Sequence, residues 1–327
     1  MRGFVFGWYG HGNLGDEAFK PAIQSLLPGV DLTFGDHLPY DINTYDFLWI
    51  GGGSFLESPI SGASHVNIPI GFVGVGLSNA LHKSNRLLLK KADLVLVRDS
   101  LSKDVWTKAT VVPDLVFLTD TLFTHCPQKK ITILMNDFIT PTESFPDWKF
   151  IAYYWFVSEF GGVCNDLIAA GYSLQFLPMG VGGVDDRRCA AAIVGRIRNK
   201  SNVNWMLEPV TSEGLLKEIS ESEFVITMRF HGMVYSTLVG TPFICIHSHD
   251  KMLSFGQDVG WEGLVNYYGF TKQRFMEVLS KIPDNELLKI YTSEAKSHWQ
   301  STLDTQVSEF LALVSQNSLL RTQKLSK

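Results

Sequence analysis

The chain has 327 residues, a length that suits two domains of ordinary size. Its 45% hydrophobic and 19% charged residues are typical of a globular protein, and its net charge of −5 argues against a nucleic-acid-binding protein, which usually carries a basic excess on one face. The four cysteines form no CxxC pair, which excludes the usual zinc spacing and a disulfide scaffold and predicts reduced thiols in the cytoplasm.

The first third of the chain alternates short apolar runs with helical patterns. We expect buried strands at residues 2–6, 46–50, 70–75 and 94–97, and helices at residues 16–27, at 79–92 and from 99 onward. The first apolar run reaches Gly7 without a cleavage site and is too short for a secretory signal. The uncharged stretch between Glu57 and Lys83 is interrupted by Gly, Pro, Ser and Asn, so it does not predict a membrane span. We therefore predict a cytoplasmic protein.

A polar break at residues 126–130 starts a second series of the same kind. We expect strands at residues 131–135, 172–177, 203–207, 224–227 and 243–247. We expect helices at residues 148–170, 185–198, 212–220 and 232–239. A long amphipathic helix over 292–314 follows, and residues 315–327 are predicted to be a frayed tail.

This alternation predicts an α/β fold with two Rossmann-like domains, each a parallel sheet covered by helices on both faces. The predicted limits are 1–127 for the first domain, 128–290 for the second, and 291–327 for the C-terminal helix and tail. Ligands of such domains bind beyond the carboxyl ends of the strands. The sequence therefore predicts a site in a central cleft that both domains face, built from loops that follow strands.

A glycine-rich loop follows the first predicted strand. Residues 7–17 (GWYGHGNLGDE) hold four glycines, whose backbone N–H groups can approach a ligand, and the next helix N-terminus favours an anion. Gly12 and Asn13 are therefore candidate substrate contacts. Glu17 is interpreted as a partner of the helix dipole, whereas Asp16 either caps the helix or contacts an acceptor. The glycine spacing does not fit the dinucleotide-binding fingerprint.

Two further loops in this half follow predicted strands. Three consecutive glycines and a serine stand at residues 51–54, where a ligand or another segment must approach closely. Gly52, Gly53 and Ser54 are therefore candidate substrate contacts. Arg98 ends another strand, where it could clamp an anion or pair with a neighbouring carboxylate, and Asp99 could cap the following helix.

The strongest candidate site follows the predicted strand at 224–227. Arg229 and His231 alternate around Phe230, so in an extended segment both side chains would point to the same side. Gly232 would open the next helix and give an anion access to its N–H groups. Lys251 follows a neighbouring strand and would reach the same end of the sheet. The structural alternative makes Arg229 part of an ion pair and His231 a substitute for an N-cap.

Together these motifs resemble the polysaccharide pyruvyl transferase family. The matching segments run in the family's order from residue 7 to residue 251: GWYGHGNLGDEA at 7–18, WIGGGS at 49–54, GVG at 74–76, VRDS at 97–100, RFH at 229–231, GTP at 240–242 and DK at 250–251. Phe230 stands where the family commonly has leucine, and His249 stands where it often has another residue. The chain after Lys251 shows no resemblance.

The resemblance implies a GT-B-like fold and a pyruvyltransferase that moves pyruvate from phosphoenolpyruvate to a sugar of a polysaccharide or glycan precursor, forming a pyruvyl ketal. It implies that phosphoenolpyruvate contacts Arg229, Phe230 and His231, together with Lys251 and Arg98. We expect His231 to protonate the enol carbon and Asp16 to orient the acceptor hydroxyl. The first domain would be the acceptor side and the second the donor side, with no cofactor and no metal.

The expected partners are phosphoenolpyruvate and a sugar or glycan acceptor, and not nucleic acid. A lipid-linked acceptor would also bring the protein into peripheral contact with a membrane. Two other functions stay open, because a fold does not fix a function. One is a GT-B glycosyltransferase that uses a nucleotide sugar, and the other is a non-catalytic sugar- or anion-binding protein.

Overall fold

The computed structural model describes residues 1–54, 56–140, 142, 146–182, 184–208 and 210–325, which form two compact units. The first unit comprises Met1–Gly10, Asp16–Thr119 and Ser293–Lys327, and the second comprises His11–Gly15 and Asp120–Thr292. The change from the first unit to the second lies at residues 119 and 120, whereas the prediction placed it at residues 127 and 128, and residues 11–15 also belong to the second unit. The backbone explains why, since the N–H groups of His125 and Cys126 donate to carbonyls of the second unit, at Val239 and Ser220.

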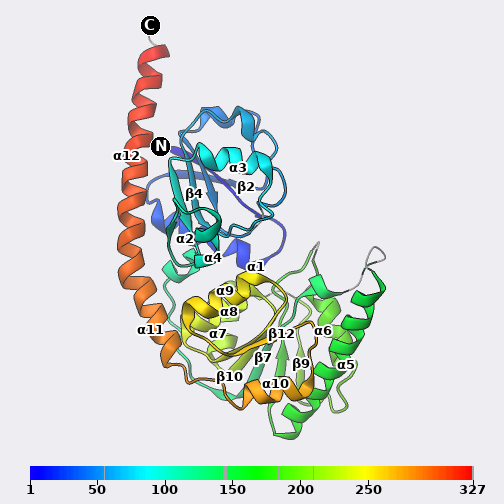
Figure 1. The fold of residues 1–327 in the computed structure, drawn as a ribbon. Coiled ribbons are helices and arrows are strands. Elements are labelled where there is room, and N and C mark those ends of the chain that lie inside the picture. Colours follow the sequence, from blue (N-terminus) through cyan, green and yellow to red (C-terminus); the bar gives the residue numbers. More distant parts are fainter. Residues whose placement is uncertain (55, 141, 143–145, 183, 209, 326–327) are drawn as a thin grey trace. The chain divides into compact units, whose positions relative to one another are not determined.

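The first unit is built on a parallel sheet, two of whose strands, β2 and β4, are labelled in Figure 1. The strand order is β2-β1-β3-β4-β5-β6. Its strands are β1 (Arg2–Phe6), β2 (Asp31–Gly35), β3 (Phe47–Gly51), β4 (Ile70–Val75), β5 (Leu94–Val97) and β6 (Thr110–Val111). Its helices before residue 119 are α1 (Leu14–Glu17), whose first half belongs to the second unit, α2 (Phe19–Leu26), α3 (Lys83–Lys90) and α4 (Ser100–Val105). Every residue of β3 and β4 is buried, as continuous apolar strands of a two-sided parallel sheet require.

The last helix of the chain also belongs to the first unit. Helix α12 (Gln300–Leu325) places Phe310 edge-on against Phe47 and Trp49 of β3, with ring centroids 5.7 and 6.1 Å away. The hydroxyl of Ser318 donates to Asp46 at 2.7 Å. The predicted frayed tail is therefore wrong up to Leu325, and residues 326–327 lie outside the described residues. The helix continues because no Gly or Pro interrupts residues 300–325.

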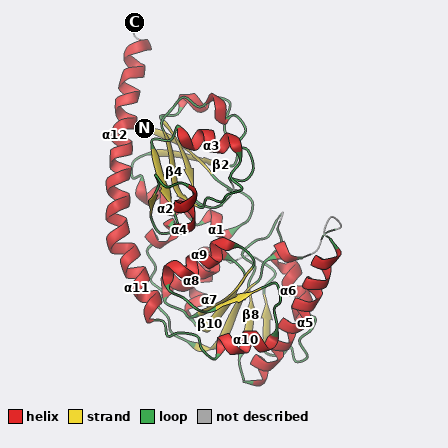
Figure 2. Cartoon of the chain, viewed as in Figure 1, coloured by secondary structure: helices red, strands yellow, loops and turns green. Residues whose placement is uncertain are grey.

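The second unit has a sheet of the same kind, with its strands drawn in yellow in Figure 2. The strands are parallel and lie in the order β12-β11-β10-β7-β8-β9. Its strands are β7 (Gln128–Leu134), β8 (Ser173–Phe176), β9 (Val203–Trp205), β10 (Ser222–Thr227), β11 (Phe243–His247) and β12 (Leu264–Asn266). Its helices are α5 (Asp147–Ala169), α6 (Asp186–Val194), α7 (Ser212–Ser220), α8 (Phe230–Val239), α9 (Asp250–Val259), α10 (Lys272–Leu279) and α11 (Glu286–Glu294), the last of which runs into the first unit. The prediction of two Rossmann-like α/β domains is confirmed.

Helix α8 packs against β10 and β11 of the second sheet and is deeply buried. All its residues are buried, in keeping with a sequence that is apolar on every side. Helix α7 packs against it, and Thr292 of α11 donates a hydrogen bond from its hydroxyl to the carbonyl of Thr237. This burial fixes the position of the residues at the N-terminus of α8, where the candidate site lies.

Candidate active site

The turn from β10 into α8 positions Arg229 and His231. The Thr227 hydroxyl accepts a hydrogen bond from the Arg229 N–H and donates one to the Arg229 carbonyl, both at 2.9 Å. Arg229 is therefore the N-cap of α8, and His231 lies in its first turn. The prediction that the two side chains alternate along an extended segment is wrong, because the helix begins at Phe230 rather than at Gly232. Gly232 packs against the strand end, since a Cβ there would lie 2.2 Å from the Thr227 hydroxyl oxygen.

The guanidinium group of Arg229 forms a two-pronged ion pair with Asp186. Nε donates to Oδ2 at 3.0 Å, and Nη2 donates to Oδ1. Both side chains are buried, with 9% of the Arg229 side chain and 1% of the Asp186 side chain exposed. The alternative that Arg229 belongs to an ion pair is thus confirmed. Among the described residues, no hydrogen-bond partner faces Nη1, so one edge of the guanidinium stays available to a ligand.

Asp186 was not among the predicted site residues. Its carboxylate also accepts hydrogen bonds from the N–H groups of Met179 (3.0 Å), Gly180 (2.8 Å) and Asp137 (3.2 Å). Burial raises the pKa of Asp186 above its usual value, while the Arg229 charge and these N–H groups oppose the shift. An aspartate at a helix start normally predicts a cap, but here Asp185 is the cap of α6. Two consecutive aspartates at the start of one helix could have indicated that Asp186 has a role other than capping, since one cap is enough.

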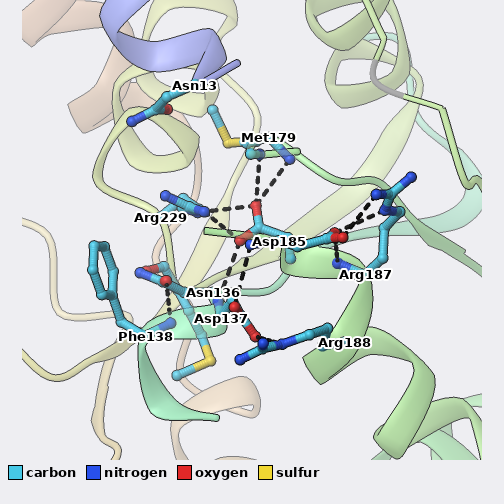
Figure 3. A network of polar contacts seen from close by, with 12 residues as sticks. Asn13, Asn136, Asp137, Phe138, Met179, Asp185, Arg187, Arg188 and Arg229 are labelled. Carbon is cyan, nitrogen blue, oxygen red and sulfur yellow. Dashed lines mark hydrogen bonds and ion pairs between the residues drawn. The ribbon is translucent and has the colours of Figure 1, made fainter. Parts of the chain in front are cut away.

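Two further ion pairs surround this buried pair (Figure 3). Arg188 donates from Nε to Asp137 at 3.0 Å, and Arg187 binds Asp185 through Nε and Nη2, each at 2.7 Å. The Arg187 hydrogen bonds lower the pKa of Asp185. With three arginines each matched by an aspartate, the network itself carries little net charge. An anionic ligand beside it therefore needs additional cations.

The loop at residues 11–15 belongs to the second unit and lies beside His231. Its backbone bonds to the segment after β8: the Leu14 N–H donates to the Met179 carbonyl at 2.8 Å, and the Val181 N–H donates to the Gly12 carbonyl at 3.1 Å. Asn13 bridges Gly180 in the same way and accepts a hydrogen bond from the Gly15 N–H.

Glycines at two positions of this loop permit the close approach. A Cβ on Gly15 would lie 2.1 Å from Nδ1 of His231, and a Cβ on Gly12 would lie 2.2 Å from the Val181 carbonyl oxygen. Gly12 also has a φ of +67°, which favours glycine. The sequence predicted a ligand as the reason for these glycines, whereas the structure shows that they let one backbone segment meet another and meet His231.

Lys251, in the first turn of α9, completes the group of cations. Its Nζ lies 6.0 Å from the centroid of the Phe230 ring, which in turn meets the His231 ring edge-on at 5.5 Å. The prediction that Lys251 reaches the same end of the sheet as Arg229 and His231 is therefore consistent with these contacts. His249 is the N-cap of α9, but its side chain makes no capping hydrogen bond.

A cavity of about 250 Å³ lies in the same unit. Its walls come from the loop after β7, the first turns of α5, and the segments after β11 and β12. The lining residues are Phe138, Ile139, Lys149, Ala152, Ser248, His249, Tyr267 and Tyr268. Asn136 ties the first wall to the β10 turn through a hydrogen bond of 3.4 Å from its amide to the Met228 carbonyl. The lining combines aromatic rings with two basic groups, Lys149 and His249.

The first unit contains a separate buried group around Arg98. Its guanidinium lies 3.6 Å from both Asp99 and Asp114, and Nη2 donates to the Ser54 hydroxyl at 2.5 Å. Asp99 caps α4 by accepting a hydrogen bond from the Ser102 N–H. Both structural alternatives for Arg98 and Asp99 are therefore seen. A contact between Arg98 and a substrate stays a prediction.

The other predicted residues of the first unit lie near the ends of β1 and β3. Gly52 and Gly53 have φ values of +73° and +81°, and a Cβ on Gly52 would lie 2.2 Å from the Phe19 ring. The Tyr9 hydroxyl donates to the Gly51 carbonyl at 2.9 Å. Burial raises the pKa of Tyr9, and the charges of Asp16 and Glu17 raise it further. A role for Asp16 toward an acceptor stays a prediction.

Asp114 should make the stability of the protein depend on pH. Burial raises its pKa from 3.8 to about 6, although the charge of Arg98 opposes the shift. The folded protein therefore holds this proton more tightly than the unfolded chain. The resulting stabilisation, up to about 3 kcal/mol, is fully present below about pH 4 and is lost as the pH rises through about 6. Asparagine at this position cannot titrate, so Asp114→Asn should remove this contribution to the pH dependence of the unfolding free energy.

Urea unfolding of wild type and Asp114→Asn across that range measures the difference between their pH dependences. Other carboxylates affect both proteins equally, so only the difference is assigned to Asp114. Parallel curves would show that folding does not raise the pKa of Asp114.

The sequence matches the polysaccharide pyruvyl transferase family over residues 13–250. This region is more than two thirds of the chain. The chain belongs to that family. The matched region of this pyruvyl transferase family member contains Arg98, Arg229 and His231 and ends just before Lys251. Membership supports a transferase that acts on sugars. A search among curated proteins finds no match.

Several solved structures are similar in fold to this pyruvyl transferase family member. The UDP-GlcNAc 2-epimerase of Methanocaldococcus jannaschii, in complex with UDP-GlcNAc and UDP, has a TM-score of 0.56 at 10% identity and covers 86% of this chain and 92% of its own. The UDP-GlcNAc 2-epimerase of Neisseria meningitidis, bound to UDP-GlcNAc, has a TM-score of 0.55 at 11% identity, with 95% and 100% covered. Acinetobacter baumannii MurG has a TM-score of 0.50 at 11% identity, with 93% and 98% covered. At these identities the likeness concerns the fold, which is the GT-B-like fold that the family resemblance implied.

Among the described residues of this family member, neither a metal cluster nor a membrane-spanning helix is found. In the described ranges, no three His, Cys, Asp or Glu side chains gather closely enough to hold a metal ion. None of the helices in those ranges is both long and apolar enough to cross a membrane.

Proposed function

We propose that this protein transfers the pyruvyl group of phosphoenolpyruvate to a sugar, where two hydroxyls take it up as a pyruvyl ketal. The observation that carries the proposal is the arrangement at the start of α8. The outer edge of the Arg229 guanidinium is left available beside His231, and Lys251 lies over the intervening Phe230. A small donor with a carboxylate and a phosphate suits two cations and a proton donor that stand at the starts of α8 and α9.

The chemistry follows from the enol phosphate. His231 donates a proton to the methylene carbon, which leaves positive charge on the neighbouring carbon that bears the phosphate. A sugar hydroxyl forms a bond to that carbon, and its proton passes to His231, which restores the acid. The bond to phosphate then breaks, a second hydroxyl of the same sugar attacks, and its proton leaves with the phosphate. Asp16 is our candidate for orienting the first hydroxyl.

A thermal-shift series tests the donor. Phosphoenolpyruvate at about one hundred times its dissociation constant should stabilise the wild type by about 2.7 kcal/mol. Phosphate or pyruvate alone should stabilise it less, because each carries only one of the two anionic groups. Arg229→Ala should abolish the effect of phosphoenolpyruvate, whereas Arg274→Ala, which removes an exposed arginine paired with Glu277, should keep it. Equal shifts in both variants would exclude Arg229 as the donor-binding residue.

The cavity favours one alternative function, a glycosyltransferase that uses a nucleotide sugar. Aromatic side chains such as Phe138, Tyr267 and Tyr268 can stack on a base, and Lys149 and His249 can meet a phosphate. The same thermal-shift series distinguishes the two functions. Stabilisation by UDP or GDP that is lost in Tyr268→Ala, without any response to phosphoenolpyruvate, would favour the alternative.

A further inference from the structure

We propose that Asp186 is the positioning residue of the site: it holds Arg229 in the orientation that meets the donor and ties that arginine to the loop beside His231. This proposal rests on the proposed function for its donor-binding test and on contacts of the second unit for its geometry. Asp186 is the first residue of α6, which follows the segment that bonds to loop 11–15.

The first argument is the number and direction of the contacts that Asp186 accepts. Two backbone N–H groups and Nε of Arg229 meet Oδ2, and the Asp137 N–H and Nη2 of Arg229 meet Oδ1. The backbone donors fix the carboxylate, and the carboxylate fixes the plane of the guanidinium. Because Nε and Nη2 are both engaged, Nη1 is the nitrogen left to turn toward an anion.

The second argument is that the same carboxylate supports the loop at residues 11–15. Its donors Met179 and Gly180 are the residues that pair with Leu14 and Asn13. The loop in turn brings Gly15 against Nδ1 of His231. Asp186 therefore connects the two predicted donor-binding side chains by short paths, directly to Arg229 and through the loop backbone to His231.

The third argument is energetic. A buried ion pair pays a desolvation cost that its attraction often fails to exceed, so stability alone gives little reason for one here. A planar, two-pronged pair does fix orientation, and an arginine that must meet a carboxylate or phosphate in one geometry benefits from that. We therefore infer that the buried pair serves to fix the orientation of the Arg229 guanidinium.

Asp186→Asn tests the proposal, because asparagine keeps the shape and removes the charge. We expect the dissociation constant for phosphoenolpyruvate to rise about tenfold or more. In an Arg229→Gln background the same change should have little further effect, about twofold or less, since Asp186 acts on the donor through Arg229. Asp185→Asn is the matched control: it removes a neighbouring carboxylate that pairs with half-exposed Arg187, and the dissociation constant should stay as in wild type.

Gly180→Ala provides a second variant that leaves the Asp186 charge intact. A Cβ there would lie 2.6 Å from Nη2 of Arg229, so it should push the guanidinium away from the carboxylate and weaken donor binding in the same way. This variant keeps the proposal testable if Asp186→Asn does not fold. Unchanged donor affinity in either folded variant would overturn the proposal, as would a full additional loss from Asp186→Asn in the Arg229→Gln background.

An NMR readout separates this proposal from the proposed function. The Nε–H signal of Arg229, assigned by its absence in Arg229→Lys, should exchange slowly with solvent in wild type and rapidly in Asp186→Asn. If wild type fails to bind phosphoenolpyruvate, the proposed function fails, and this exchange rate still decides whether Asp186 holds the arginine. Rapid exchange in wild type would overturn the positioning role.

Discussion

His231→Asn is expected to lower kcat for pyruvyl transfer by about a hundredfold or more, because it removes the group that protonates the enol carbon. The imidazole lies in the first turn of α8 and is 8% exposed, so the solvent has little access through which water could replace it. Donor binding should persist, because Arg229 and Lys251 are unchanged. The variant should therefore keep the thermal stabilisation by phosphoenolpyruvate while losing turnover.

The matched control is His37→Asn, which changes an exposed histidine of the first unit paired with Asp36. Its kcat should equal that of wild type. A His231→Asn enzyme that folds and keeps full kcat would exclude His231 as the acid. Loss of turnover together with loss of donor binding would instead assign His231 to binding.

Phe310→Ala is expected to destabilise the first unit by about 3–5 kcal/mol, the range for deleting a buried phenylalanine side chain. Phe310 is 4% exposed, and its ring meets those of Phe47 and Trp49. The alanine variant leaves a cavity between α12 and β3 that the rigid strand cannot close. Urea unfolding followed by tryptophan fluorescence measures the effect, since Trp49 lies in the affected contact.

Leu313→Ala serves as the control on the same helix. Its side chain is 36% exposed, so the loss should stay below about 1 kcal/mol. Because the chain has two units, the transition assigned to the first unit must be resolved from that of the second. Equal effects of the two substitutions would show that Phe310 does not anchor α12.

The periodic parts of the fold could be predicted from the sequence. The strands at residues 2–6, 70–75, 94–97 and 243–247 agree with the structure to the residue, because buried parallel strands are continuous apolar runs, and these four end before a Gly, a Ser or a charged residue. Helix α7 was also predicted with its observed limits. The extent of α12 could not be predicted, because its last turns are polar and their partner, Asp46, lies far away in the sequence.

The candidate site could be predicted only in part. Arg229, His231 and Lys251 stood out because cations after neighbouring strands are unusual in an acidic protein. Asp186 did not, because its partners are backbone N–H groups and an arginine that become neighbours only in the folded chain. The reason for a glycine at position 15 could not be predicted either, because only the structure shows that a Cβ there would collide with His231.

The first unit is made from stretches at both ends of the chain, and this affects how the protein is made on the ribosome. All strands of that unit and the whole second unit are synthesised before α12 emerges. Until then Phe47 and Trp49 lack the ring of Phe310 that covers them. The second unit can therefore complete its core while the first unit still has an apolar face uncovered, and transiently exposed apolar surface of this kind is prone to aggregate.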